Sequence, residues 1–354
     1  MSETKWKTAS MTEIPSTENL IERSHVVSLP LRKSFRGLVS REVMLFEGAY
    51  GPAEWAPFPE YSHDLAARWL AAALEQGFSP SIRGRSSSLE SIAVNATFPS
   101  LPPKEISHWW QYFPGVRSAK IKVAEQGQHL RDDMERVAEL RRAVGPNVTI
   151  RLDANARWTV NQAAEALEKL EEFSIDYVEQ PVATTQEMVD LRQRLRGTGI
   201  RLAADELIRH SHALDELIAE RAADVAVLKV SPLGGIGTTR SLAIKAHNSG
   251  MEVVISSALE SSVGLSWGVQ AAALLQDEIG GLADAGLGTA AFFASDTTIK
   301  PLEISNGAVS VSEPVLDYSS LKQHAAFPDR VKWWNERLER CLPLALKLLD
   351  AHEN

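Results

Sequence analysis

A regular alternation of strand-like runs and helical segments is the feature of this sequence that most constrains its fold. From about residue 90 onward, short apolar and β-branched runs alternate with segments whose apolar residues recur every three or four positions. This alternation is typical of βα units that build a parallel sheet. Eight such units predict an α/β barrel. The candidate strands are residues 91–98, 118–123, 148–155, 176–182, 201–206, 225–231, 252–258 and 281–287.

The segments on either side of the predicted barrel have different patterns and divide the chain. Residues 1–21 are polar, have no apolar run and are expected to be a disordered tail. Residues 22–90 combine strand-like runs with a helical segment, which indicates an α+β capping domain. The barrel is expected over residues 91–295, and residues 296–354 are expected to return to the capping domain. The predicted fold class is therefore α/β, a (β/α)7β-type TIM-like barrel whose N-terminal capping domain is completed by the C-terminal segment.

Composition excludes several classes of protein. Apolar residues make up 44% and charged residues 23% of the chain, and no apolar run reaches the eighteen or so residues that a membrane span needs. The net charge of −9 argues against binding to nucleic acid or to an anionic membrane. Cys341 is the only cysteine, which rules out an internal disulfide and fits a cytoplasmic protein. The expected partner is a small-molecule substrate, and the sequence carries no indication of the oligomeric state.

Three carboxylates end three consecutive candidate strands. Asp153, Glu179 and Asp205 follow each other at equal intervals of about one βα unit. Because the carboxyl ends of barrel strands share one rim, these side chains are expected at one height. Three hard oxygen donors that converge in this way favour a divalent cation, most naturally Mg²⁺, for which Mn²⁺ can substitute.

Other interpretations of these carboxylates stay open at this point. A single Asp after a strand is more often a helix N-cap than a metal ligand. Glu179 is a poor cap, however, and the equal spacing favours a metal site for the whole set. Glu206 stands beside Asp205, which leaves open which of the two is the ligand, and we expect a supporting role for Glu206.

Two lysines share one face of the strand that precedes Asp153. Lys120 and Lys122 are two residues apart, so both side chains leave the strand on the same side. Lys229 ends the strand that follows Asp205, which places lysines on both sides of the carboxylates. A lone lysine here would be interpreted as a surface residue. The whole set suits removal of a proton alpha to a carboxylate, in which a metal stabilises the enediolate and an amine takes the proton.

Five short motifs carry a resemblance to a known family. They are KIK at 120–122, LDAN at 152–155, VEQP at 178–181, ADE at 204–206 and LKVSPLGG at 228–235. In this order they resemble the muconate-lactonizing subgroup of the enolase superfamily, over about residues 30–320. The resemblance implies that Lys122 abstracts the proton, that Lys229 stabilises the enolate, and that the charge of Lys120 keeps Lys122 from holding its own proton too tightly. The implied metal ligands are Asp153, Glu179 and Asp205, with Asn155 and Glu206 as supporting residues.

Longer segments narrow the resemblance. Residues 41–61, 94–99, 256–265 and 294–311 are similar to those of the o-succinylbenzoate synthases within this subgroup. This similarity implies a magnesium-dependent dehydration of 2-succinyl-6-hydroxy-2,4-cyclohexadiene-1-carboxylate in menaquinone biosynthesis. One alternative is an N-acylamino acid racemase or dipeptide epimerase of the same subgroup, with the lysines as bases on opposite faces. A non-catalytic barrel is a second alternative, but it would be expected to have lost at least one of the charged residues.

Weaker signals concern contacts with the substrate. Ser256, Ser257 and Ser262 follow a candidate strand and are candidates to donate hydrogen bonds to a substrate carboxylate, although a serine here is as often a helix cap. Gly234 is expected to let the chain approach the substrate closely. The resemblance further implies that a loop over residues 48–58 closes over the active site.

Overall fold

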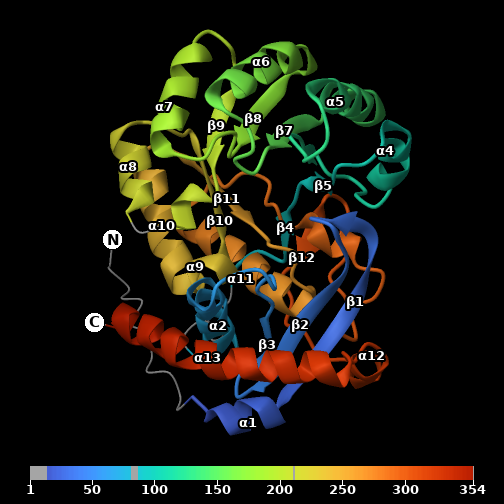
Figure 1. Cartoon of the computed structure of the whole chain (residues 1–354), viewed down its shortest axis with the longest axis vertical. Coiled ribbons are helices and arrows are strands. Elements are labelled where there is room, and N and C mark those ends of the chain that lie inside the picture. Colours follow the sequence, from blue (N-terminus) through green and yellow to red (C-terminus); the bar gives the residue numbers. More distant parts are fainter. Residues whose placement is uncertain (1–13, 81–86, 210–211, 354) are drawn as a thin grey trace.

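The computed structural model of the chain describes residues 14–80, 87–209 and 212–353. The barrel and the capping domain lie one above the other, with the teal and green barrel helices at the top of Figure 1 and the blue and red capping elements at the bottom. Among the described residues, no helix has both the length and the apolar character that a membrane crossing requires.

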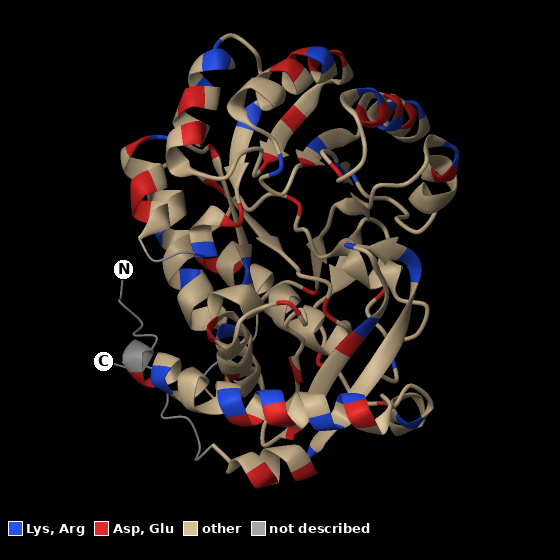
Figure 2. Cartoon of the chain, in the orientation of Figure 1, with Lys and Arg blue, Asp and Glu red and all other residues tan. Residues whose placement is uncertain are grey.

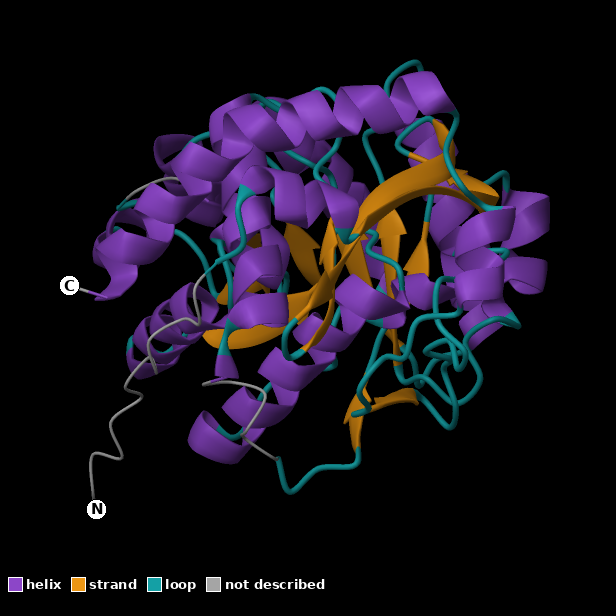
Figure 3. Ribbon diagram, turned by 90° about the horizontal axis from the view of Figure 1, so that it is seen from below, coloured by secondary structure: helices purple, strands orange, loops and turns teal. Residues whose placement is uncertain are grey.

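A curled sheet of seven parallel strands forms the barrel, and helices surround it (Figure 3). Along the sheet, the strands follow their order in the sequence, so each strand lies beside the next one in the chain. They are β5 (Ala96–Phe98), β6 (Ser118–Lys122), β7 (Thr149–Asp153), β8 (Ile175–Glu179), β9 (Arg201–Ala204), β10 (Val225–Lys229) and β11 (Glu252–Ser256). The helices between and after them are α4 (Pro103–Trp110), α5 (Leu130–Val144), α6 (Val160–Leu170), α7 (Thr185–Arg194), α8 (Ala213–Ala219), α9 (Val230–Leu233), α10 (Ile236–Asn248) and α11 (Ser262–Ile279).

The segment expected to be the eighth strand, residues 281–287, closes the barrel through isolated bridges. Ala285 forms a parallel bridge to Val94 and Gly286 forms one to Ser256, so the segment joins the two edges of the sheet. A Cβ atom on Gly286 would lie 2.2 Å from the hydroxyl oxygen of Ser256, so only glycine allows this close approach.

The first candidate strand, residues 91–98, divides into two pieces. β4 (Ser91–Ala93) pairs antiparallel with β12 (Ala308–Ser310), whereas β5 enters the barrel. In β4 only the middle residue is buried, which suits a ribbon with one face in solvent, and all three residues of β5 are buried, which suits a barrel strand. The two pieces thus differ in burial: β4 is buried on one face and β5 on both faces.

The capping domain is a three-stranded antiparallel sheet that packs against helices from the two ends of the chain. Its elements are β1 (Ser24–Phe35), β2 (Leu38–Gly48), β3 (Gly51–Trp55), α2 (His63–Phe78) and, from the C-terminal segment, α12 (Tyr318–Gln323) and α13 (Pro328–Glu353). The inner face of α13 adds Trp334, Leu338 and Leu342 to the capping core, while charges of both signs alternate along its outer side (Figure 2). The C-terminal helix is therefore an integral part of this domain.

The prediction of a disordered tail is wrong for its last residues. Residues 17–21 belong to helix α1 (Thr17–Glu22), and residues 1–13 lie outside the described part of the chain. The hydroxyl of Ser16 caps the helix by accepting from the backbone N–H of Asn19, and Leu20 is fully buried in the core shared with α13. One buried apolar residue, Leu20, is thus enough for this short polar helix to pack against the capping core.

Candidate active site

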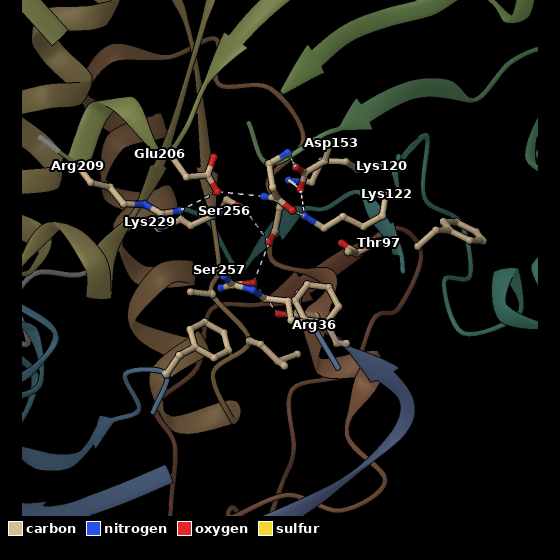
Figure 4. A pocket seen from close by; sticks show the side chains of 18 of the residues that line it. Arg36, Thr97, Lys120, Lys122, Asp153, Glu206, Arg209, Lys229, Ser256 and Ser257 are labelled. Atoms are coloured by element: carbon tan, nitrogen blue, oxygen red, sulfur yellow. Dashed lines mark hydrogen bonds and ion pairs between the residues drawn. The ribbon is translucent and has the colours of Figure 1, made fainter. Parts of the chain in front are cut away.

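A cavity lies between the carboxyl ends of the barrel strands and the capping domain (Figure 4). We call its two sides the barrel wall and the capping wall. The barrel wall consists of the cavity-lining residues Thr97, Phe98, Lys120, Lys122, Asp153, Asn155, Glu206, Arg209, Lys229, Ser256, Ser257, Ala258, Leu259, Gly286 and Thr289. We count with it the buried Glu179 and Asp205, which form ion pairs with Lys120 and Lys229 of this set. The capping wall consists of Phe35, Arg36, Phe58 and Tyr61.

The three carboxylates expected at one height do lie side by side. Asp153 and Glu179 are the last residues of β7 and β8 and pair with each other across the two strands. Asp205 directly follows β9, the next strand in the sheet. All three side chains are buried, with Glu179 fully inaccessible to solvent. The equal spacing in the sequence thus corresponds to adjacent strand ends in the barrel.

The lysine pair of β6 points at these carboxylates. The Nζ atom of Lys120 lies 2.6 Å from Glu179 Oε2 and 3.8 Å from Asp153 Oδ2. The Nζ atom of Lys122 lies 2.7 Å from that same Asp153 oxygen. Both ammonium groups therefore reach the inside of the barrel on one side of the carboxylate set, as the shared strand face predicts.

Lys229 approaches the set from the opposite side. Its Nζ atom forms an ion pair with Asp205 and lies 4.0 Å from Glu179 Oε1. Figure 4 shows Lys120 and Lys122 to the right of the group and Lys229 to the left. Lysines thus flank the carboxylates on both sides.

Burial and close charges shift the proton equilibria of this group. Burial raises the pKa of Glu179 to about 7 against the opposing charge of Lys120, and the neighbouring Asp153 adds to the rise. Burial opposes the charged form of Lys120, but Glu179 and Asp153 outweigh it and raise the pKa of its ammonium group. Burial likewise opposes ionisation of Asp205, but Arg209 and Lys229 lower the pKa of its carboxyl. Of the three carboxyl groups at the strand ends, Glu179 is therefore the one whose pKa is raised.

The donor set fits a hard divalent cation. Glu179 Oε1 and Glu206 Oε2 are buried oxygens with no hydrogen-bond partner among the described residues, and such orphaned acceptors are costly unless a cation or water satisfies them. No three acidic, histidine or cysteine side chains of the described ranges surround one point as a ready metal cluster. Instead, lysine ammonium groups lie against the carboxylates. Oxygen-only donors of this kind are what Mg²⁺ prefers.

Asn155 links the lysine pair to Glu206. Its side-chain oxygen accepts from Lys122 Nζ, and its Nδ2 atom donates to Glu206 Oε1 at 3.0 Å. The backbone of Asn155 has φ 45°, in the left-handed region that asparagine tolerates better than most residues. Both residues expected to support the site therefore contact it.

Arg209 belongs to the site and was missed by sequence reasoning. Its NH2 atom donates to both oxygens of Asp205 at 2.8 Å and lies 3.8 Å from Glu206. The only signal in the sequence is its position four residues after Asp205, beyond the predicted strand end. Thr97 lies within the segment 94–99 that carries part of the resemblance, whereas Thr289 of the barrel wall carried no signal in the sequence.

Two of the predicted substrate contacts line the cavity and two lie elsewhere. Ser256 and Ser257 are part of the barrel wall, and the hydroxyl of Ser257 lies 2.6 Å from that of Thr289. Ser262, by contrast, donates to Asp296 at 2.8 Å, and it does so from the first turn of α11, behind the cavity wall. Gly234 also lies away from the cavity.

Gly235, in the turn between α9 and α10, contacts the capping domain and does not line the cavity. A Cβ atom on Gly235 would lie 2.4 Å from Glu75 Oε2, and this carboxylate accepts from the backbone N–H groups of Ile236 and Gly237. The first of these bonds is 2.6 Å long and the second 3.1 Å. Glycine at this position therefore makes room for a capping-domain carboxylate at the start of α10, where the helix N-terminus favours a negative charge.

The capping wall differs in part from the loop expected over residues 48–58. Phe58 lines the cavity, but the turn at Gly48 packs against the end of α2, where a Cβ atom would lie 2.4 Å from the Gly77 carbonyl oxygen. The tip of the β1–β2 hairpin, with Phe35 and Arg36, forms the rest of this wall together with Tyr61. Sequence reasoning missed the hairpin tip entirely.

A buried arginine joins the capping wall to the barrel wall. Arg41 Nε donates to the carbonyl oxygen of Leu259 at 3.1 Å, and its NH2 atom donates to that of Ala56. Its guanidinium also lies 4.2 Å from the ring centre of Phe58. Leu259 has φ 67°, a strained backbone for a residue with a Cβ atom. Burial lowers the pKa of Arg41 to about 10, so it keeps its charge at neutral pH.

Comparisons with known proteins agree with this geometry. The model of the family "Enolase C-terminal domain-like" matches residues 105–314, and "Enolase N-terminal domain-like" matches residues 26–77. The o-succinylbenzoate synthase of Mycobacterium marinum is 42% identical over 331 residues, which cover 92% of this chain and 95% of that protein. Further mycobacterial relatives with the same name are 38–41% identical.

Solved structures show the same fold at low sequence identity. The muconate lactonizing enzyme from Pseudomonas putida has a TM-score of 0.70 at 17% identity, over 86% of this chain and 98% of that one. The N-succinyl Arg/Lys racemase from Bacillus cereus has a TM-score of 0.69 at 20% identity, over 86% and 97%. The predicted barrel with a capping domain and the resemblance read from the five motifs are both confirmed. This chain belongs to the enolase superfamily and, within it, to the family of the o-succinylbenzoate synthases.

Proposed function

We propose that this protein is an o-succinylbenzoate synthase, a lyase that removes water from 2-succinyl-6-hydroxy-2,4-cyclohexadiene-1-carboxylate in menaquinone biosynthesis. The observation that carries the proposal is the placement of Lys122 and Lys229 on opposite sides of three adjacent carboxylates. The 42% identity to a relative of that name over 92% of the chain supports the choice of substrate. We further propose that the protein acts in the cytoplasm on this small molecule and needs neither a membrane nor nucleic acid.

The metal ligands in this proposal are Asp153, Glu179 and Asp205. A bound Mg²⁺, or Mn²⁺ in its place, would neutralise negative charge that develops on the carboxylate of the substrate. The orphaned Glu179 Oε1 supports the assignment, because a buried acceptor without a partner is expected to bind a cation.

Lys122 is the proposed base. The C–H bond alpha to the ring carboxylate breaks, and its proton moves to the uncharged Nζ atom of Lys122. Asp153 and Asn155 hold this nitrogen from two sides, which fixes its direction for the transfer. The C–O bond to the hydroxyl then breaks, and the proton on Lys122 leaves with hydroxide as water, so the ring becomes aromatic.

Lys229 stays protonated in this reaction and stabilises the enolate. Its ion pair with Asp205 holds its positive charge on the side opposite Lys122. A fixed charge that is already in place when the enolate forms costs no reorganisation during the reaction. Lys120, paired with Glu179, keeps a second positive charge close to the base.

A racemase is the second candidate, since two lysines on opposite sides are also what a two-base mechanism requires. Purified protein with Mg²⁺ should convert the cyclohexadiene substrate with a higher kcat/KM than it racemises N-succinylamino acids. A higher kcat/KM for racemisation would favour the second candidate, and full activity in excess chelator would contradict the metal assignment.

A further inference from the structure

Among the residues that the structure describes, Arg36 is the one basic side chain of the cavity without an acidic partner. Lys120, Lys122, Arg209 and Lys229 also line the cavity, and each of them forms an ion pair with a carboxylate. Within the described ranges, Arg36 forms no ion pair; its NH1 atom donates to the Tyr61 hydroxyl at 3.3 Å. The charge of Arg36 is therefore available to an anionic group in the cavity.

The side chain of Arg36 is oriented by aromatic neighbours of the same wall. Its guanidinium lies 4.4 Å from the ring centre of Phe58, a distance typical of a cation–π contact. Neither this contact nor the one to Tyr61 neutralises the charge. A guanidinium held in this way presents a planar set of donors that matches the two oxygens of a carboxylate.

The backbone of the hairpin tip is an unusual place for an arginine. Arg36 and Gly37 connect the paired residues Phe35 and Leu38 and have φ values of 52° and 79°. Two-residue turns with both central residues in the left-handed region favour asparagine, aspartate or glycine at the first position. An arginine there is held in a costly conformation, as is common at binding sites.

The hairpin tip also lies close to the proposed base. The ring centre of Phe35, the residue before Arg36, is 6.0 Å from Lys122 Nζ. In Figure 4, Arg36 lies on the side of the capping hairpin, with Lys120, Lys122 and Asp153 on the barrel side. A substrate that reacts at Lys122 would therefore have its far end near the capping wall.

We propose that Arg36 binds the distal carboxylate of the substrate, at the end of the succinyl chain, while the ring carboxylate lies at the barrel wall. This inference rests on the proposed function, because that substrate carries two carboxylates in these positions. Arg36 would then select substrates with a second anion at that distance from the reacting carbon.

The test compares ligands with and without the distal charge. Inhibition constants of o-succinylbenzoate and of its distal amide, which is neutral, are measured for wild type, Arg36→Gln and Arg36→Lys. The control is Arg32→Gln, because Arg32 lies on the same strand and stacks on Tyr112 outside the cavity. Wild type and the control should prefer the acid over the amide about 10- to 100-fold, the range expected for a charge-assisted hydrogen bond. Arg36→Gln should lose this preference, and Arg36→Lys should keep part of it.

Kinetics separate the failure of this inference from the failure of the proposed function. For the cyclohexadiene substrate, Arg36→Gln should raise KM about 10- to 100-fold with little change in kcat, as expected for loss of binding that is uniform along the reaction. If wild type turns over this substrate while Arg36→Gln keeps the wild-type preference for the acid, the assignment of Arg36 is wrong. If wild type does not turn it over, the proposed function is wrong, and the inhibition constants still test Arg36.

Discussion

On the barrel wall, the charged residues stand at the ends of adjacent strands, whereas the residues of the capping wall come from a hairpin tip and a loop. Strand geometry fixes the first set: Lys122, Asp153 and Glu179 are direct neighbours across β6, β7 and β8. Tertiary contacts fix the second set, such as the stacking of Arg36 on Phe58. The comparison suggests that the repeating scaffold carries the chemistry and the irregular wall carries recognition.

The two walls also differ in their electrostatics. Lys120 and Glu179 are buried and paired, so removing either one leaves an uncompensated charge in a dry environment. Arg36 is exposed and stacks on a ring, so removing it leaves no buried group unpaired. Substitutions on the barrel wall should therefore change the rate of the chemical step, and substitutions on the capping wall should change substrate binding.

The largest effect is expected at Lys122. Lys122→Ala should lower kcat about 10²–10⁴-fold, because no other described side chain occupies the same position beside Asp153 and Asn155 to accept the proton. Steady-state rates with the cyclohexadiene substrate measure the loss. The matched control is Lys104→Ala, an exposed lysine on α4. A wild-type rate in Lys122→Ala would show that the base is another residue.

A smaller effect is expected for metal binding at the barrel wall. Glu179→Gln removes the charge of the carboxylate with the orphaned oxygen, so the Mg²⁺ concentration for half-maximal activity should rise at least about tenfold. Calorimetric titration of chelator-treated protein with Mg²⁺ gives a readout that is independent of activity. Glu168→Gln, at an exposed position of α6, is the control. Unchanged Mg²⁺ affinity in Glu179→Gln would remove Glu179 from the ligand set.

The barrel wall was predictable from the sequence because its geometry repeats. The equal spacing of Asp153, Glu179 and Asp205 places them on one rim, since one βα unit returns the chain to the same rim, although it left the choice between Asp205 and Glu206 open. Lys120 and Lys122 could be placed from the two-residue period of a strand. The isolated bridges of Ala285 and Gly286 still occupy the expected position of the eighth strand, although they form no continuous ladder.

The capping wall could not be predicted because its positions depend on contacts between distant segments. Arg36 reaches the cavity only through the turn at the hairpin tip, and no periodic pattern marks such a residue. Ser262 was misplaced because Ser261 caps α11 and turns the following residue toward Asp296. Gly234 was misplaced because it ends α9 in the left-handed region with φ 95°, and its neighbour Gly235 accommodates Glu75 of the capping domain, which lies more than 150 residues earlier in the chain.

A substitution of Arg41, which contacts both walls, tests whether the capping wall affects substrate binding without affecting the chemical step. Arg41→Met leaves the carbonyl oxygens of Leu259 and Ala56 without a donor, which should lower the free energy of unfolding by about 1–3 kcal/mol for each. Because Leu259 lines the cavity, KM should rise as well, whereas kcat should change less. Urea unfolding and steady-state kinetics measure both, with exposed Arg32→Met as the control. A selective loss of kcat would contradict the division of roles between the walls.

The smallest effect concerns how the free energy of unfolding depends on pH through Glu54, which joins the capping sheet to the start of α11. Burial raises the pKa of Glu54 to about 8, and its carboxylate accepts from the backbone N–H groups of Ser261 at 3.1 Å and Gly264 at 3.0 Å. A carboxyl whose pKa is raised on folding binds more protons in the folded than in the unfolded chain between its ordinary pKa, 4.5, and about 8. Its contribution to stability is therefore complete below pH 4.5 and is lost as the pH rises toward 8.

Glu54→Gln should make the free energy of unfolding less dependent on pH within this window. The slope should change by at most about 1.4 kcal/mol per pH unit, the value for one proton. Urea unfolding at several pH values between 5 and 8 measures the slope, and Glu60→Gln, at an exposed position in the turn that follows β3, should keep the wild-type slope. If Glu54→Gln also keeps that slope, the carboxyl of Glu54 is ionised in the folded protein. In that case Glu54 would accept the hydrogen bonds from Ser261 and Gly264 as a charged carboxylate at every pH between 5 and 8.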